Sequence, residues 1–173
     1  MLNYEEWFQW APSNNSLAFI QGNNRVSTTN KQLEIKNIQE NNTSTHTPKG
    51  FVDRDFSWIS NNKILVSRSV ESNLKDFSER PLPSIHHINL QTGKEKKITS
   101  PSENEGDFYP IIINNGKSFI WIRTDREKVA VYIGDIGNGK QKRWIENIDL
   151  GAWYYGHWSW DEVFNIYLPN RKD

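Results

Sequence analysis

Apolar and polar positions follow one order in three separate parts of the chain. Each part opens with an acidic residue, and Phe or Pro follows three positions later. Two positions after that stands a large apolar residue, which we call the anchor. A polar turn then leads to a second apolar run. The anchors are about 50 residues apart, which leaves room for four short strands and their turns. The three parts begin as Glu5–Trp10, Asp53–Trp58 and Asp107–Ile112.

The second half of the repeated unit also recurs. Ser84–Leu90 and Val129–Ile133 are alternating or nearly continuous apolar runs, as expected of third strands. Each is followed by a glycine turn, at Gly93 and Gly139, that leads into a fourth strand. In the first unit the third strand falls near 33–38 and the fourth is obscure. The pattern predicts three four-stranded antiparallel units, over approximately 5–50, 51–100 and 105–150.

The C-terminal part of the sequence has a different period. Ser159 and Glu162 form a capping-box pattern, and the apolar residues that follow recur at helical spacing. We therefore expect a short amphipathic helix at approximately 160–167. A fourth unit starting at Trp158 would fit the spacing, but it lacks the acid and the turn residues.

Composition supports sheets and narrows the class of partner. The 173 residues include 8 Trp, 8 Phe and 6 Tyr within a hydrophobic total of only 35%, and large rings pack well on a pleated surface. The 21 basic and 21 acidic residues leave no excess charge, which argues against nucleic acid and anionic membrane. The N-terminus is polar and no apolar run approaches the ~20 residues of a spanning helix, so the sequence as written predicts a cytoplasmic chain with no signal peptide and no direct membrane insertion.

Signals for metal or cofactor chemistry are weak. The chain has no cysteine, and the adjacent His86 and His87 point to opposite faces of a predicted strand. Gly134–Gln141 resembles a phosphate-binding loop, but Gln141 stands where such a loop needs Ser or Thr, and the same turn occurs one unit earlier. We interpret this segment as a hairpin and expect no metal, no cofactor and no catalytic residues.

The repeated pattern resembles the repeats of TolB-like β-propellers. The shared features are the opening acid, the apolar anchor, the Asn or Gly turn and the strand that follows, such as Leu17–Ile20. The best-matching stretch is Asp107–Ile133, and the resemblance extends over about 5–150. It implies an all-β fold, a partial β-propeller of about three four-stranded antiparallel blades with a short C-terminal helix, as a single unit over 1–173. TolB-like propellers are usually six-bladed and exported, so the chain looks like the C-terminal half of such a protein. A full-length bacterial relative would then lie in the cell envelope.

In such a propeller the turns between strands one and two and between strands three and four share one rim, and they are short here. The longer connections, which include Gln39–Val52 and Ser69–Pro83, share the opposite rim, where recognition usually resides. Acids at the blade entries and arginines after the second strands also fall on this rim, and together they would hold a peptide or polar ligand. The alternative is that each acid secures its blade entry or pairs with the arginine of a neighbouring blade. These candidate residues are Glu5, Asp53, Asp107, Arg68, Arg123 and Arg126.

Two functions from different classes remain open. The favoured hypothesis is a non-catalytic module that binds a protein or peptide partner on the long-loop rim. The alternative is part of a propeller-type hydrolase or lyase that acts on peptides or oligosaccharides. Because three blades are fewer than the ~4–8 that close a ring, we also expect the open edges to meet a second copy of the chain or missing N-terminal blades.

Overall fold

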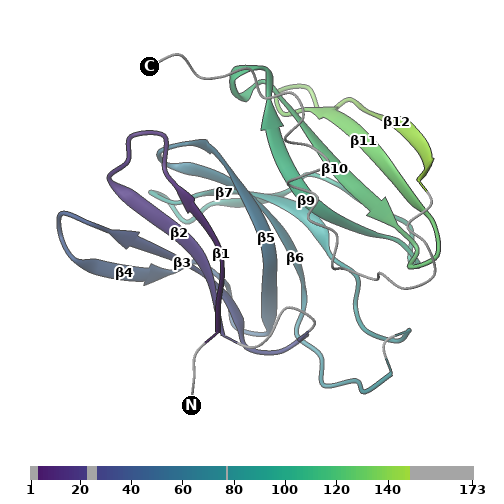
Figure 1. The fold of residues 1–173 in the computed structure, drawn as a ribbon, viewed down its shortest axis with the longest axis horizontal. Helices are drawn as coiled ribbons and strands as arrows, with labels where there is room; N and C mark the ends of the chain where they lie inside the picture. The colour runs from purple at the N-terminus through teal and green to yellow at the C-terminus, as the bar shows by residue number, and fades with distance from the viewer. Residues whose placement is uncertain (1–3, 23–26, 77, 149–173) are drawn as a thin grey trace.

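The computed structural model describes residues 4–22, 27–76 and 78–148, and these residues form three four-stranded antiparallel sheets in chain order (Figure 1). The all-β partial propeller that the sequence predicts is therefore confirmed. The helix expected at 160–167 lies outside the described residues. Blade 1 contains β1 (Tyr4–Trp10), β2 (Ser16–Gly22), β3 (Lys31–Asn37) and β4 (Asn42–Thr45). Blade 2 contains β5 (Phe51–Ser60), β6 (Lys63–Val70), β7 (Ser84–Asn89) and β8 (Glu95–Lys97). Blade 3 contains β9 (Gly106–Ile113), the short 3-10 turn η1 (Asn114–Gly116), β10 (Ser118–Thr124), β11 (Val129–Asp135) and β12 (Gln141–Ile148).

Strand register shows that the three blades are built alike. The opening acid of each first strand lies opposite the same position of the second strand, as Glu5 with Gln21, Asp53 with Arg68 and Asp107 with Arg123. The anchors are equivalent in the same way, as Trp10 with Leu17, Trp58 with Ile64 and Ile112 with Phe119. The repeat read from the sequence is thus a repeat of structure.

An irregularity two residues after each acid recurs in the three first strands. The pairing register shifts between Glu6 and Gln9 in β1, and the first strands of the other two blades shift at the same place. Trp7 and Tyr109 take positive φ values there, of 61° and 54°, as extra residues in a bulge can. Their rings meet edge to face with centroids 5.0 Å apart, and the Asp55 carboxylate accepts the backbone N–H of Tyr109 at 2.9 Å. Equivalent residues of the three blades, Trp7, Asp55 and Tyr109, therefore lie close together, as the first strands of a propeller do.

Each blade has a front face toward the blade before it in the chain and a back face toward the blade after it. Successive residues of a strand point to opposite faces, so β6 supplies both faces and is buried over most of its length. The back face of blade 1 packs against the front face of blade 2 through Ala18, Ile20, Leu33, Ile35, Phe56, Trp58, Ile64 and Val66. The back face of blade 2 packs against the front face of blade 3 through Leu65, Ile85, Phe119 and Trp121.

Short turns and long loops lie on opposite rims of the three blades, with the long β6–β7 loop in the lower part of Figure 1. The long-loop rim is held by hydrogen bonds between blades. Thr28 and Ser72 exchange backbone and hydroxyl hydrogen bonds, and the Asp107 N–H donates to the Pro83 carbonyl at 2.8 Å. The loops of this rim therefore form a connected surface.

Candidate functional site on the long-loop rim

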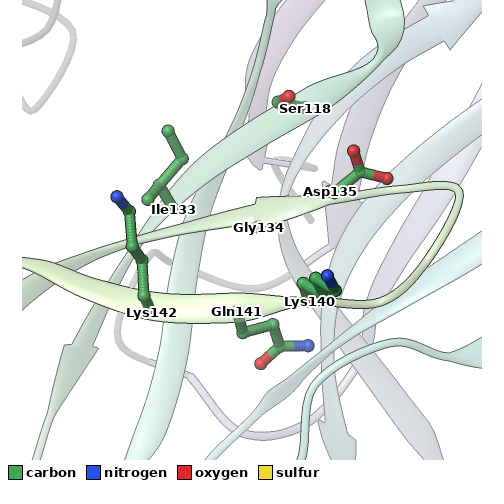
Figure 2. A pocket seen from close by; sticks show the side chains of 7 residues that line it. All are labelled: Ser118, Ile133, Gly134, Asp135, Lys140, Gln141 and Lys142. Carbon is green, nitrogen blue, oxygen red and sulfur yellow. The ribbon is translucent and has the colours of Figure 1, made fainter.

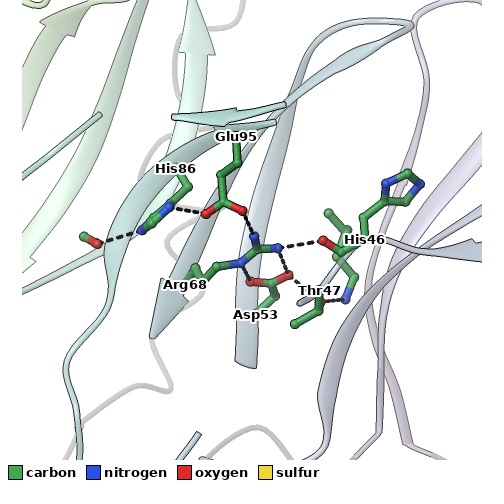
Figure 3. Close-up of polar contacts among 8 residues, drawn as sticks. His46, Thr47, Asp53, Arg68, His86 and Glu95 are labelled. Atoms are coloured by element: carbon green, nitrogen blue, oxygen red, sulfur yellow. Dashed lines mark hydrogen bonds and ion pairs between the residues drawn. The ribbon is translucent and has the colours of Figure 1, made fainter. Parts of the chain in front are cut away.

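The entry of blade 2 contains a buried ion pair (Figure 3). Asp53 on β5 lies opposite Arg68 on β6, and Arg68 Nε and Nη2 each donate to the Asp53 carboxylate at 2.7 Å. The exposed fractions of the two side chains are 0% and 1%. Thr47 also donates to Asp53, and Arg68 Nη2 reaches the His46 carbonyl at 2.9 Å. The pair thus ties the connection from blade 1 to the first two strands of blade 2.

Burial and pairing act in opposite directions on these charges. Burial raises the pKa of the Asp53 carboxyl, and the hydrogen bonds from Arg68 and Thr47 act against that rise. Burial alone would lower the pKa of Arg68, but the contacts with Asp53 and Glu95 raise it above its ordinary value. Arg68 therefore remains a cation, with its remaining donor Nη1 on Glu95 of β8.

Blade 3 repeats this pair with an aromatic shell. Arg123 Nε and Nη2 donate to the Asp107 carboxylate at 2.7 and 2.8 Å, and Trp121 Nε1 donates to the same carboxylate at 2.9 Å. The Arg123 guanidinium also lies over the Tyr132 ring, 4.5 Å from its centroid. Asp107 is fully buried, whereas 12% of the Arg123 side chain is exposed. This carboxylate is therefore occupied by groups of its own blade.

The six sequence-predicted residues are thus brought together only in part. Asp53 with Arg68 and Asp107 with Arg123 form pairs within a blade, through their cross-strand register, and not with the arginine of a neighbouring blade. Glu5 lies opposite Gln21, so blade 1 has no arginine at this position. Arg126 follows β10 and donates from Nη2 to the Arg80 carbonyl at 2.5 Å. These contacts give both pairs a structural role, and a ligand-binding role for the six residues stays a prediction.

Two arginines outside the predicted set, Arg54 and Arg80, lie on the same rim as the predicted Arg126. Arg54 stands in the β5 bulge between Asp53 and Asp55, and burial lowers its pKa. The positive charges of Arg80 and Arg126 lower the pKa of Arg54 further, whereas the charge of Asp55 raises it. Among the residues that the structure describes, the buried Nε of Arg54 has no hydrogen-bond partner. We call Arg54, Arg80 and Arg126 the rim arginines.

Metal sites and phosphate loops find no support in the described part of the chain. No three His, Asp or Glu side chains there come close enough together to hold a metal ion, and no helix there is long and apolar enough to cross a bilayer.

The segment after Gly134 is a hairpin turn between β11 and β12, as predicted, with the Asp135 carboxylate accepting the N–H groups of Gly137 and Asn138. Beside this hairpin is an open hollow with lysines at its edge (Figure 2). It is lined by Ser118, Ile133, Gly134, Asp135, Lys140, Gln141 and Lys142.

Comparisons with known proteins show the fold. No family model matches the chain, and no curated protein matches it in sequence. TolB from Acinetobacter baumannii is similar in structure at 19% identity with a TM-score of 0.57, over 82% of this chain and 32% of that one. A putative TolB from Agrobacterium tumefaciens is similar at 16% identity with a TM-score of 0.58, over 83% of this chain and 49% of that one. A prolyl endopeptidase is similar at 12% identity with a TM-score of 0.65, over 84% of this chain and 22% of that one.

The chain therefore has the fold of part of a TolB-like β-propeller. It spans between about a third and a half of the TolB structures and about a fifth of the endopeptidase. Identities this low show the shared fold alone, because propellers of one architecture have many functions.

Proposed function

We propose that this chain is a non-catalytic propeller module that binds a protein or peptide partner on its long-loop rim, and that the partner brings carboxylate groups to the rim arginines. The observation that carries the proposal is the convergence of three positive charges on one rim, with the Nε of Arg54 buried and unpartnered among the described residues. A guanidinium offers paired N–H donors that match a carboxylate, so an acidic side chain or a free C-terminus is the ligand chemistry that fits.

The rest of the rim supports a role in positioning. The two buried acid–arginine pairs hold the entries of blades 2 and 3, and the Arg80 carbonyl accepts a hydrogen bond from Arg126. Arg80 itself donates from Nε to the Leu74 carbonyl at 3.1 Å. A surface fixed in this way loses little conformational entropy when a partner binds, which favours affinity. A bacterial cell-envelope setting, which the resemblance to TolB implies, is part of the same proposal.

The test is the binding of a fluorescently labelled Glu/Asp-rich peptide, followed by fluorescence anisotropy at low and high salt. A Gln/Asn-rich peptide of the same length is the comparison ligand. We expect the acidic peptide to bind and Arg54→Gln or Arg126→Gln to weaken its affinity about tenfold or more, because a hydrogen bond to a charged group contributes about 1.5–3 kcal/mol.

A matched control removes the same charge elsewhere. Arg143 on β12 is 48% exposed and contacts Tyr132 and Glu146, away from the rim arginines. Arg143→Gln is expected to leave the affinity unchanged. The proposal is wrong if Arg54→Gln and Arg143→Gln bind the acidic peptide equally well, or if both peptides bind alike. The double variant Asp107→Ala with Arg123→Ala, checked for folding by circular dichroism, tests whether the blade 3 pair also contacts the ligand.

The second candidate is a unit of a propeller peptidase or lyase. The likeness of the chain to part of a prolyl endopeptidase favours it. Its test is an activity screen on peptides and oligosaccharides with and without divalent metal. Turnover by the purified chain would replace the non-catalytic proposal.

A further inference from the structure

The front face of blade 1 exposes aromatic residues that blade 2 buries at the same positions. Register makes Trp10 equivalent to Trp58, and Phe8 and Phe56 stand two residues before them in the sequence repeat. Phe8 is 53% exposed and Trp10 is 54% exposed, whereas Phe56 is 1% and Trp58 is 7% exposed. A sheet face built like a blade interface but open to solvent is a docking surface.

The interface between blades 1 and 2 shows what such a tryptophan requires. Trp58 Nε1 donates to the Gln9 carbonyl at 3.1 Å, which places the indole over the back face of blade 1. Ala18 pairs directly with Gln9 on this face, and Ala11 follows the last residue of β1, two positions after Gln9. Both alanines are buried in the same cluster as Trp58. The large ring thus occupies a recess that two small side chains leave.

At the interface between blades 2 and 3 the anchor side chain is smaller and the residues that it faces are larger. Ile112 stands at the anchor position in place of tryptophan, and it packs in a cluster with Ile59 and Leu65. By register, Leu65 is equivalent to Ala18, and Ile59 follows the anchor Trp58 as Ala11 follows the anchor Trp10. A large anchor therefore faces two small residues, and a medium anchor faces two medium ones, as close packing demands.

We propose that the front face of blade 1 docks a further four-stranded antiparallel blade whose back face carries alanine-sized residues at the two positions opposite Trp10. This proposal concerns a different surface from the rim and stands without the proposed function. The occupant that it selects is a blade of the blade 1 kind, since the back face of blade 1 already accepts a Phe–Trp front face.

The same size pattern disfavours a second copy of this chain as the occupant. A copy would offer the back face of its blade 3, where Ile113 and Ile120 stand in place of the two alanines. Moreover, Ile120 and Ile122 are only 6% and 2% exposed. Seating Trp10 against them would overpack the contact.

The experiment adds residues 4–50, which form blade 1, as an extra blade ahead of the full chain. We expect this fusion to be monomeric and to melt about 5 °C above the original chain, because Phe8 and Trp10 of the original blade become buried. Trp10→Ala in the original blade is expected to lower the Tm of the fusion by several degrees and to change the Tm of the unfused chain little.

The matched control is the same fusion with Ala11→Ile and Ala18→Ile in the added blade. If the added blade did not dock, these substitutions would lie on an exposed sheet face, where isoleucine is well tolerated, so a loss of the Tm gain reports on docking. The proposal is overturned if both fusions melt alike, if neither melts above the original chain, or if the original chain forms a dimer that Trp10→Ala dissociates.

Discussion

The front faces of blades 1 and 2 carry the same aromatic pair in opposite environments. Phe56 and Trp58 are buried against blade 1, whereas Phe8 and Trp10 face solvent apart from the stacking of Phe8 on Phe19 with ring centroids 6.0 Å apart. The two pairs stand at the same positions of the repeat, and Trp10 and Trp58 have equivalent strand partners, so the difference in burial comes from the neighbouring blade. The repeat motif therefore encodes a face prepared for docking, and burial follows only where another blade is present.

This difference has an energetic consequence. Phe and Trp each bury about 150–250 Å² in a core, and apolar burial contributes about 25 cal/mol per Å². The blade 1–2 interface accordingly provides a stabilisation that the front face of blade 1 does not. Within the described residues, stability should be concentrated in the two closed interfaces on either side of blade 2.

The largest expected effect separates the two tryptophans. Trp58→Ala removes the indole from the alanine recess of blade 1 and is expected to lower the free energy of unfolding by about 3–5 kcal/mol. Trp10→Ala removes an exposed ring and is expected to cost less than about 1 kcal/mol. Urea unfolding of both variants measures the contrast. Equal losses would mean that Trp10 is covered in solution, and the comparison between the faces would fail.

A second contrast concerns the blade entries. Arg123→Met leaves the buried Asp107 carboxylate without its cation and is expected to cost about 3 kcal/mol, at the lower end for a broken buried pair because water reaches part of Arg123. Gln21→Met, at the equivalent position of blade 1, breaks no arginine pair and is expected to cost less than about 1 kcal/mol.

Urea unfolding of these two variants also tests the role of the pair. Similar losses for the two would show that the blade 3 pair contributes no more than an ordinary polar position. Asp107→Asn with Arg123→Met should recover part of the loss, because the carboxylate charge is then no longer buried alone.

Much of the fold follows from the sequence because it depends on patterns local to each strand. The anchors Trp10, Trp58 and Ile112 and the glycine hairpins mark blades that the structure confirms. The fourth strand of blade 1, Asn42–Thr45, was obscure because all four residues are polar and exposed, so no apolar period marks it. It forms by pairing with β3.

The site was less predictable than the fold. The acids and arginines of the rim were found from their positions, but their pairing within a blade depends on a register that the bulges shift. Arg54 gave no signal, because it lies between two acids in sequence, and the charges of Arg80 and Arg126 act on its pKa only after three segments fold together. Long-range placement of this kind has no local pattern.

The smallest expected effect is a pH dependence of stability that arises from histidines near the blade 1–2 and blade 2–3 interfaces. The described histidines, His46, His86 and His87, lie in blade 2 or in the connection that leads to it, and burial lowers the pKa of each. The unfolded chain, with histidine near pKa 6.5, therefore binds protons more readily than the folded protein. Stability is complete above about pH 6.5 and decreases as the pH falls through the lower folded-state values.

We expect Tm to fall by a few degrees between about pH 7 and pH 5, and His87→Gln to reduce that fall. His87 is the informative site because burial and the positive charges of Lys63 and Lys96 all lower its pKa, whereas Glu95 counteracts the effect at His86. The window stops at about pH 5 so that carboxyl groups with ordinary pKa values near 4 contribute little to the change in Tm. A Tm that is constant or rises on acidification in this window would show that these histidines are as accessible to protons in the folded blades as in the unfolded chain.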